Sequence, residues 1–337
     1  MALPGEPTNP SRSEYDRRVV DACLRVLGTL VKATDSQERP RLVVVGGLAP
    51  LLLLPESRQD LVVREDPHPG TNDVDLCIQL DVAEDEELYI VLEQALEELG
   101  FVPGPRNDGR GESVWQWVRD VDDSRIAVEF LAPADSVGGD GAGARNGPPI
   151  GRIAEDEPTR PGDEIGALRV RAGELALRDA VPATIDIELL GRPDGVPAGL
   201  ALVRVWVANL LPMLVLKGFA LKNRLKDKDA FDIVWLLRHW PDGPVGAARA
   251  ARASVVADSP HVGDAFAILR ECFASHDREG CVRYATFELG PRPTVPREDR
   301  LRLARDAQGT VARFLQAWDT LADATPAPAR DAGAQGA

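Results

Sequence analysis

Two aspartates at the start of an apolar segment are the residues in this chain best suited to chemistry. The segment runs from Gly70 to Ile78 and is typical of a β-strand. Because alternate strand residues point to one face, Asp73 and Asp75 should project together. Two adjacent carboxylates repel each other unless a cation lies between them, and Mg2+ binds such oxygens readily. The pair therefore predicts a metal site, with a solvated strand start as the alternative.

A glycine pair and a third carboxylate lie on neighbouring predicted strands. Residues 41–45 form a short apolar strand that runs into Gly46 and Gly47 and then into an apolar helix start. Glycines allow a sharp turn there and let a phosphate approach the free N–H groups of a helix N-terminus. Downstream, residues 125–131 alternate as a strand that carries Glu129. Glu129 therefore offers a third carboxylate.

Basic and acidic residues follow a fixed order in the second half of the chain. A predicted helix over residues 210–224 carries a central lysine, and a second helical segment follows it. The members of this ordered set are Lys217, Ala220, Arg224, Lys228, Asp229 and Asp232. Together with the glycine pair and the Asp-x-Asp strand, the set resembles the nucleotidyltransferase superfamily, which has the polymerase-beta-like fold. Within it, the chain is most similar to the AbiEii-type, MenT-like family of type IV toxins, over residues 41–240.

The chain departs from that family pattern in three ways. Leu48 and Ala49 stand where family members usually carry Ser or Thr after the glycine pair, so one hydroxyl contact to a phosphate is missing. The connection that follows is longer than usual and contains Arg58, Arg64 and His68. The third acid is glutamate where aspartate is common. The missing hydroxyl keeps a non-catalytic binding module open as an alternative.

The resemblance implies a reaction and a role for each residue. Asp73 and Asp75 would bind two Mg2+ ions with the triphosphate of an NTP. Glu129 would hold the metal nearest the attacking hydroxyl or assist its deprotonation. Lys217 would steady the triphosphate, and Asp229 would orient Lys217 or the acceptor. The implied nucleotide-binding residues are Gly46, Gly47, Lys217, Arg224 and Lys228. An in-line displacement would then transfer a nucleoside monophosphate and release pyrophosphate.

The acceptor is not determined by these residues. The resemblance favours the 3′ end of tRNA or a protein hydroxyl, within a toxin–antitoxin pair whose separately encoded antitoxin would bind DNA. A small-molecule adenylyltransferase that modifies a cationic, aminoglycoside-like substrate is the alternative enzyme, and the acidic balance of the chain would suit it. The alternative from another class is the non-catalytic module with the same fold.

Composition limits the classes of partner. The 337 residues are 44% hydrophobic and 28% charged, which is ordinary for a globular protein. The net charge of -15 argues against a generally basic surface for nucleic acid, but it allows a local basic groove. Such a local cluster consists of Lys217, Lys222, Arg224, Lys226 and Lys228.

Neither a zinc site nor a membrane segment is predicted. The four cysteines are scattered, with no Cys-x2-Cys pair, and none of the four histidines stands at triad or ligand spacing from a partner. Each histidine is therefore expected to be structural or exposed. The apolar runs are far shorter than the roughly 20 residues that cross a bilayer. We expect a cytoplasmic protein with no membrane partner.

The hydrophobic periodicity, read with the resemblance, predicts an α+β fold. We expect a nucleotidyltransferase-type mixed sheet core with flanking helices, followed by a mainly helical C-terminal region. Residues 114–118 and 125–131 should pair as an antiparallel hairpin. The expected divisions are a flexible tail over 1–13, the core over 14–165, strands plus Lys- and Asp-bearing helices completing the active site over 166–240, a helical C-terminal domain over 241–323 and a disordered tail over 324–337.

Overall fold

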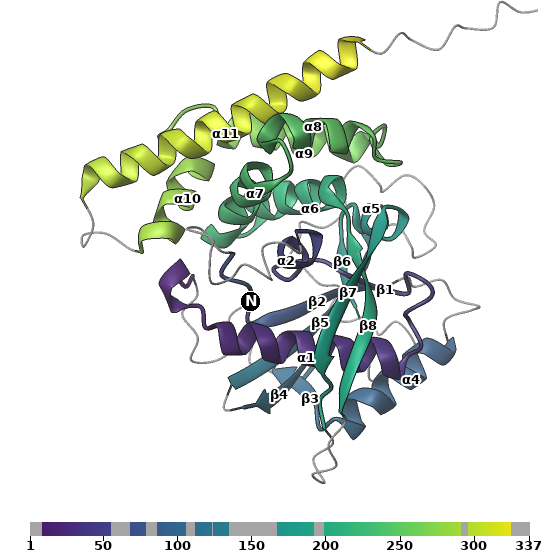
Figure 1. Cartoon of the computed structure of the whole chain (residues 1–337). Coiled ribbons are helices and arrows are strands. Elements are labelled where there is room, and N and C mark those ends of the chain that lie inside the picture. The colour runs from purple at the N-terminus through teal and green to yellow at the C-terminus, as the bar shows by residue number, and fades with distance from the viewer. Residues whose placement is uncertain are drawn as a thin grey trace, which may run out of the picture.

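The structure, a computed structural model, is an α+β fold built on one mixed sheet. It describes residues 9–54, 68–78, 86–105, 112–122, 124–134, 167–191, 199–290 and 296–324. Within these residues the chain passes from a sheet with flanking helices to a region that is entirely helical after the last strand (Figure 1). The predicted fold class is confirmed at this level.

Eight strands form the sheet within the described part of the chain. They are β1 (Leu42–Val44), β2 (Asp73–Ile78), β3 (Val102–Pro105), β4 (Glu112–Val121), β5 (Ser124–Pro133), β6 (Leu168–Val170), β7 (Ala180–Glu188) and β8 (Leu200–Ala208). Seven of them follow the order β3-β4-β5-β2-β1-β8-β7, and β6 pairs with β5. β2 is thus an inner strand, paired in parallel with β5 and antiparallel with β1.

The predicted hairpin is confirmed and sets the register of β5. β4 and β5 pair antiparallel around a tight turn at Val121 and Ser124, which places Gln116 opposite Glu129. On its other edge β5 pairs with β2, which places Glu129 opposite Asp75. Glu129 is therefore flanked on both sides within the sheet.

Four helices in the first half of the chain accompany the sheet. They are α1 (Arg17–Ala33), α2 (Ala49–Leu53), α4 (Glu86–Glu98) and α5 (Gly173–Arg178). α1 begins after Asp16, whose side chain accepts a hydrogen bond from the backbone N–H of Arg18 and so caps the helix. Its apolar face, including Val26, Leu27 and Leu30, is fully buried in the core, and α1 lies across the sheet in Figure 1.

Six further helices follow β8. They are α6 (Leu210–Asn223), α7 (Asp227–His239), α8 (Gly243–Arg252), α9 (Pro260–Cys272), α10 (Glu279–Leu289) and α11 (Arg297–Ala324). Figure 1 shows them gathered on one side of the sheet, with α6 and α7 nearest to it. α6 is apolar around its whole circumference because it is enclosed between the sheet and the other helices.

Residues 9–13, expected to belong to a flexible tail, contact the helical region. A short 3-10 helix, η1 (Arg12–Glu14), begins after the buried Ser11. Arg12 forms an ion pair of 2.8 Å with Glu288, and the Asn9 side chain accepts a hydrogen bond from the backbone N–H of Asp227. The other expected tail residues, 1–8 and 325–337, lie outside the described residues, as do Arg58 and Arg64.

Among the helices that the structure describes, none combines the length and apolar character needed to cross a membrane.

Candidate functional site

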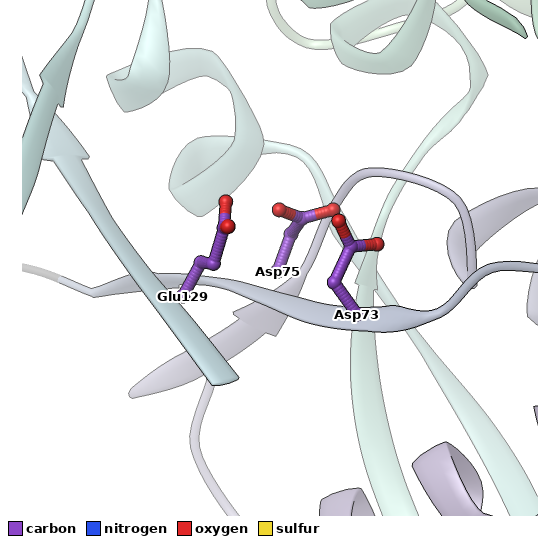
Figure 2. Close-up of side chains that lie close together, drawn as sticks. All are labelled: Asp73, Asp75 and Glu129. Carbon is purple, nitrogen blue, oxygen red and sulfur yellow. The ribbon is translucent and has the colours of Figure 1, made fainter. Parts of the chain in front are cut away.

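The three predicted carboxylates come together on the inner strands. Asp73 and Asp75 lie on β2 and Glu129 on β5, and Figure 2 shows all three side chains rising from the same side of the sheet. One carboxylate oxygen from each lies within 4.8 Å of the others. A set of three hard oxygen donors at this spacing fits a divalent cation such as Mg2+. We call Asp73, Asp75 and Glu129 the acidic triad.

The strand pairing explains why these side chains meet. Asp73 and Asp75 are half-buried while Val74 and Leu76 between and after them are fully buried, as expected for alternating faces. The backbone N–H of Val45, next to the glycine pair, donates to the carbonyl of Asp75 at 3.0 Å. The end of β1 is therefore fixed beside the triad by a backbone hydrogen bond.

The two aspartates differ in their electrostatic surroundings. Burial, together with the nearby charges of Asp73 and Glu129, raises the pKa of Asp75 to about 7. Burial also acts to raise the pKa of Asp73, but the Lys226 ammonium and a hydrogen bond from the Thr71 hydroxyl outweigh it, and the pKa falls to about 2. In the absence of a cation, Asp73 therefore ionises far more readily than Asp75.

The glycine pair makes room for the acidic and basic side chains around it. Gly46 has φ +64°, and a Cβ there would lie 1.7 Å from Oδ2 of Asp75. A Cβ on Gly47 would lie 2.7 Å from the hydroxyl of Thr71 and 2.8 Å from Nζ of Lys228. Both positions therefore require glycine, because the triad and its neighbours occupy the space of a side chain.

Lys217 lies in a buried ion-pair network between α6 and α7. Its ammonium is 2.8 Å from Asp229 and 2.7 Å from Asp232. Asp229 also accepts two hydrogen bonds from Arg224, at 2.7 and 2.8 Å. Lys228 donates to both oxygens of Asp232, at 2.9 and 3.1 Å. We call these five residues the ionic network.

The aspartates of the ionic network remain ionised despite their burial. Burial acts to raise the pKa of Asp229, but the charges of Arg224 and Lys217 outweigh it and lower the pKa well below its usual range. The pKa of Asp232 is likewise lowered, because Lys217 and Lys228 together outweigh burial. The network thus sets three cations against two carboxylates and has one surplus positive charge, directly beside the acidic triad.

Two cations in the turn between α6 and α7, Arg224 and Lys226, interact with the acidic triad. The Arg224 side chain is 37% exposed. Burial acts to lower its pKa, but the charges of Asp229, Asp75 and Asp73 outweigh burial and raise the pKa above its usual range. The pKa of Lys226 is raised although burial and Arg224 oppose the shift, because Asp73 and Glu129 attract its proton. The turn therefore presents cations next to the three carboxylates, where a metal-bound polyphosphate would lie.

The structure brings most of the predicted site residues together. Lys217 and Lys222 differ from the prediction in what they contact. Lys217 was expected to reach a nucleotide; its side chain is 7% exposed, and its ammonium pairs with two aspartates. Lys222 is exposed and pairs with Glu271 at 2.9 Å, so it is not part of the ionic network. The local basic cluster is thus reduced to Arg224, Lys226 and Lys228.

Two neighbours of the triad were not predicted. Gln116 is buried and donates its Nε2 hydrogen to Glu129 at 2.8 Å, and the hairpin register would have identified it. The Thr71 hydroxyl is buried, hydrogen bonds to Asp73 and lies next to the Gly47 position, so a hydroxyl does lie beside the glycine pair, contributed by the segment that precedes β2. The sequence signal for Thr71 is its position two residues before Asp73.

No protein-family model matches the chain, and neither a curated protein nor a solved structure matches it.

Proposed function

We propose that this protein is a metal-dependent nucleotidyltransferase that transfers a nucleoside monophosphate from an NTP to an acceptor hydroxyl. The observation that carries the proposal is the convergence of three carboxylates from two adjacent parallel strands, beside a turn that requires Gly46 and Gly47. The adjoining surplus of positive charge complements a polyphosphate. The mixed sheet with β2 inside it agrees with the nucleotidyltransferase-type core that the sequence resembles.

The acidic triad would hold up to two Mg2+ ions, which neutralise charge as it develops on the phosphate. Glu129, whose Oε1 accepts a hydrogen bond from Gln116, would take the proton of the attacking hydroxyl. The acceptor oxygen bonds to the α-phosphorus, the bond from that phosphorus to the bridging oxygen breaks, and pyrophosphate leaves with the electron pair.

The basic residues would have two roles: some would bind the phosphates, and Lys217 would hold other site residues in place. Arg224 and Lys226 are the residues we assign to the triphosphate, because both face the triad and Arg224 is partly exposed. Nζ of Lys228 pairs with Asp232 and lies 2.8 Å from the position that a Cβ on Gly47 would take, so we assign it to phosphate oxygens at the glycine turn. Lys217 instead supports the site, since its two aspartate partners hold Arg224 and Lys228 in place.

The test is a transfer assay with purified protein, Mg2+, total RNA and each α-labelled NTP in turn. We expect label in an acceptor with at least one NTP, and a loss of more than about 100-fold in the Asp73→Asn, Asp75→Asn double variant, which exceeds the effect of indirect changes at metal sites. Asp319→Asn, an exposed carboxylate paired with Arg270 at 2.6 Å, is the matched control and should retain activity. Equal transfer by the double variant and the parent would overturn the proposal.

We further propose that the enzyme is an AbiEii-like toxin acting on tRNA 3′ ends or a protein hydroxyl. The support is the ordered set from Lys217 to Asp232, whose members contact each other as one network. Expression of the parent alone should arrest bacterial growth, while the double variant should not. Harmless expression of an active enzyme would favour the small-molecule adenylyltransferase, and label on no acceptor would favour the binding module.

A further inference from the structure

His68 uses both of its ring nitrogens in the interior of the protein. Nδ1 lies 3.0 Å from the backbone nitrogen of Gly70, and Nε2 lies 3.0 Å from Oδ1 of Asp232. A backbone N–H can only donate, so Nδ1 is the acceptor and the ring proton of the neutral imidazole is on Nε2. Nε2 therefore donates to Asp232, and the two contacts define one tautomer.

The surroundings of His68 keep the ring neutral and fixed. Its side chain is fully buried, and the ring packs against Phe231 at 5.4 Å and Trp235 at 4.8 Å between centroids. Burial lowers the pKa of His68 to about 4, although the hydrogen bond with Asp232 acts in the opposite direction. At neutral pH the imidazole is therefore uncharged and keeps the same two hydrogen bonds.

Gly70 marks the point where the chain turns into β2. Its φ of +86° is a conformation that favours glycine, and a Cβ there would lie 2.1 Å from Val20 of α1. Asp73 begins β2 three residues later. The backbone is therefore held on one side by α1 and through its N–H by His68.

Asp232 connects this contact to the ionic network. The same carboxylate that accepts from His68 is 2.7 Å from Lys217 and 2.9 Å from Lys228. Both oxygens of Asp232 are thus engaged on α7, which gives the imidazole a rigid acceptor. A continuous chain of hydrogen bonds runs from α6 and α7 through the imidazole to the residues that precede Asp73.

We infer that His68 is a positioning residue of the metal site, which fixes the start of β2 against α7 and so holds Asp73 and Asp75 in the geometry that binds a divalent cation. The inference rests on the proposed function only in taking the acidic triad as a metal site. His68 touches neither metal nor substrate and acts through the Gly70 N–H.

Two substitutions separate the two hydrogen bonds of His68. His68→Asn places an acceptor near the position of Nδ1 and keeps the bond to Gly70, whereas His68→Gln extends to the position of Nε2 and keeps the bond to Asp232. The measurement is Mg2+ binding by calorimetry without nucleotide, alongside unfolding by urea. We expect His68→Gln and His68→Asn each to lose about 10 to 100-fold in Mg2+ affinity, as supporting residues of metal sites do, because each variant breaks one of the two hydrogen bonds that join the start of β2 to α7.

His239→Gln is the matched control, because His239 lies on the same helix, stacks on Trp235 at 4.5 Å and hydrogen bonds to the Trp235 carbonyl at 2.9 Å. It should bind Mg2+ as the parent does. Unchanged Mg2+ affinity in His68→Gln, with only a loss of stability, would overturn the positioning role and leave the proposed function standing. A parent that does not bind Mg2+ would overturn the metal site itself and both proposals with it.

A measurement on the parent alone makes the test independent of how the variants fold. In nitrogen-15 NMR spectra, His68 should be the Nε2–H tautomer, and Mg2+ should shift both its ring signals and the Gly70 amide signal. Ring and amide signals that do not change while Mg2+ binds would contradict the inference.

Discussion

Asp75 is the residue whose charge the metal-free protein accommodates least well. Asp73 has the Thr71 hydroxyl and the Lys226 ammonium as partners, whereas Asp75 lies between two other carboxylates. Its pKa of about 7 lies far above the usual 3.8 for aspartate. A group whose folded pKa is raised contributes stability that is present below the unfolded pKa and is lost as pH rises through the folded pKa. Metal-free protein should therefore become less stable between about pH 4 and pH 7, from the ordinary pKa of aspartate up to the raised pKa of Asp75.

Asp75→Asn should remove that loss of stability. In EDTA at pH 8, the variant should have a higher free energy of unfolding than the parent, by about 1–2 kcal/mol, because an ionised carboxylate in a repulsive site is replaced by a neutral amide. At pH 5, where Asp75 is protonated in the folded parent, the two should differ much less. Urea unfolding at both pH values measures the difference.

With Mg2+ present, the parent should be more stable than Asp75→Asn. The parent gains stability as Mg2+ binds the folded state, and the variant, which lacks a ligand, gains little. Asp186→Asn, an exposed strand carboxylate on β7, controls for loss of a negative charge and should follow the parent at both pH values. A parent that is equally stable at pH 4 and pH 7 in EDTA would contradict the assigned electrostatics.

The aspartate pair could be predicted from the sequence because its geometry depends on local strand alternation, which places Asp73 and Asp75 on one face by a spacing of two. Glu129 meets them through the parallel pairing of β5 with β2, which is not a local contact, and its role was implied by the family resemblance. The role of His68 could not be predicted, because its partner Asp232 is 164 residues away along the chain. Contacts of that separation depend on how helices dock, which periodicity does not determine.

Among the elements, the turn from β1 to α2 depends on Gly46. Gly46→Ala should lose more than 3 kcal/mol of stability, since the methyl group would meet both the positive φ and the Asp75 carboxylate at 1.7 Å. Mg2+ affinity should fall as well, because the collision can only be relieved by moving Asp75 or the turn. Thermal unfolding and calorimetry with Mg2+ measure the two effects.

Gly243→Ala separates the effect of the positive φ from the effect of the collision with Asp75. Gly243 has φ +62°, but a Cβ there would meet nothing within 4 Å, so the variant reports backbone strain alone, about 1 kcal/mol. Equal losses in the Gly46 and Gly243 variants, with Mg2+ affinity intact in both, would mean that the turn does not support the triad.

The packing of α6 against α7 depends on the ionic network. Lys217→Ala leaves Asp229 and Asp232 buried with fewer partners, and removing one member of a buried ion pair typically costs about 3–5 kcal/mol. Lys222→Ala removes an exposed lysine from the same helix and should cost less than about 1 kcal/mol. Urea unfolding of both variants makes the comparison. Equal stability of the two would show that Lys217 is free to serve a nucleotide.

The elements were easier to predict than their order in the sheet. The hairpin of β4 and β5 follows from local pattern and is present. The placement of β8 beside β1, in parallel, is not encoded in either strand alone. α6 and α7 follow β8 directly, and Lys228 of α7 lies next to the Gly47 position.

At the scale of the whole molecule, the C-terminal helices share one core with the site. Phe231 of α7 packs against Phe287 at 4.7 Å and stacks on Tyr284 at 6.2 Å, both on α10. The buried Arg283, also on α10, donates to the carbonyls of Leu221 and Arg224 at 2.8 and 2.9 Å and so satisfies the end of α6. The cations at the turn between α6 and α7 are thus held from the C-terminal side.

This shared core predicts that the region from residue 241 onward is not a separable domain. Truncation to residues 1–240 removes α8 to α11 and exposes Phe231 together with the face of α6 that Ala265 covers. Each large apolar side chain returned to water costs about 1.5–3 kcal/mol, and several of them equal the 5–15 kcal/mol that holds a typical domain folded. The truncated chain should therefore be unfolded or aggregated, and it should not bind Mg2+.

The full chain should unfold in a single cooperative transition, with the same urea midpoint by tryptophan fluorescence and by far-ultraviolet circular dichroism. Truncation to residues 1–324, which keeps every described helix, is the control and should match the full chain in midpoint and in Mg2+ affinity. Two separate transitions, or a soluble 1–240 fragment that binds Mg2+ with unchanged affinity, would show two independent domains. In that case Arg283 could not be what holds the α6 end of the site, and the cations would have to be positioned by the sheet alone.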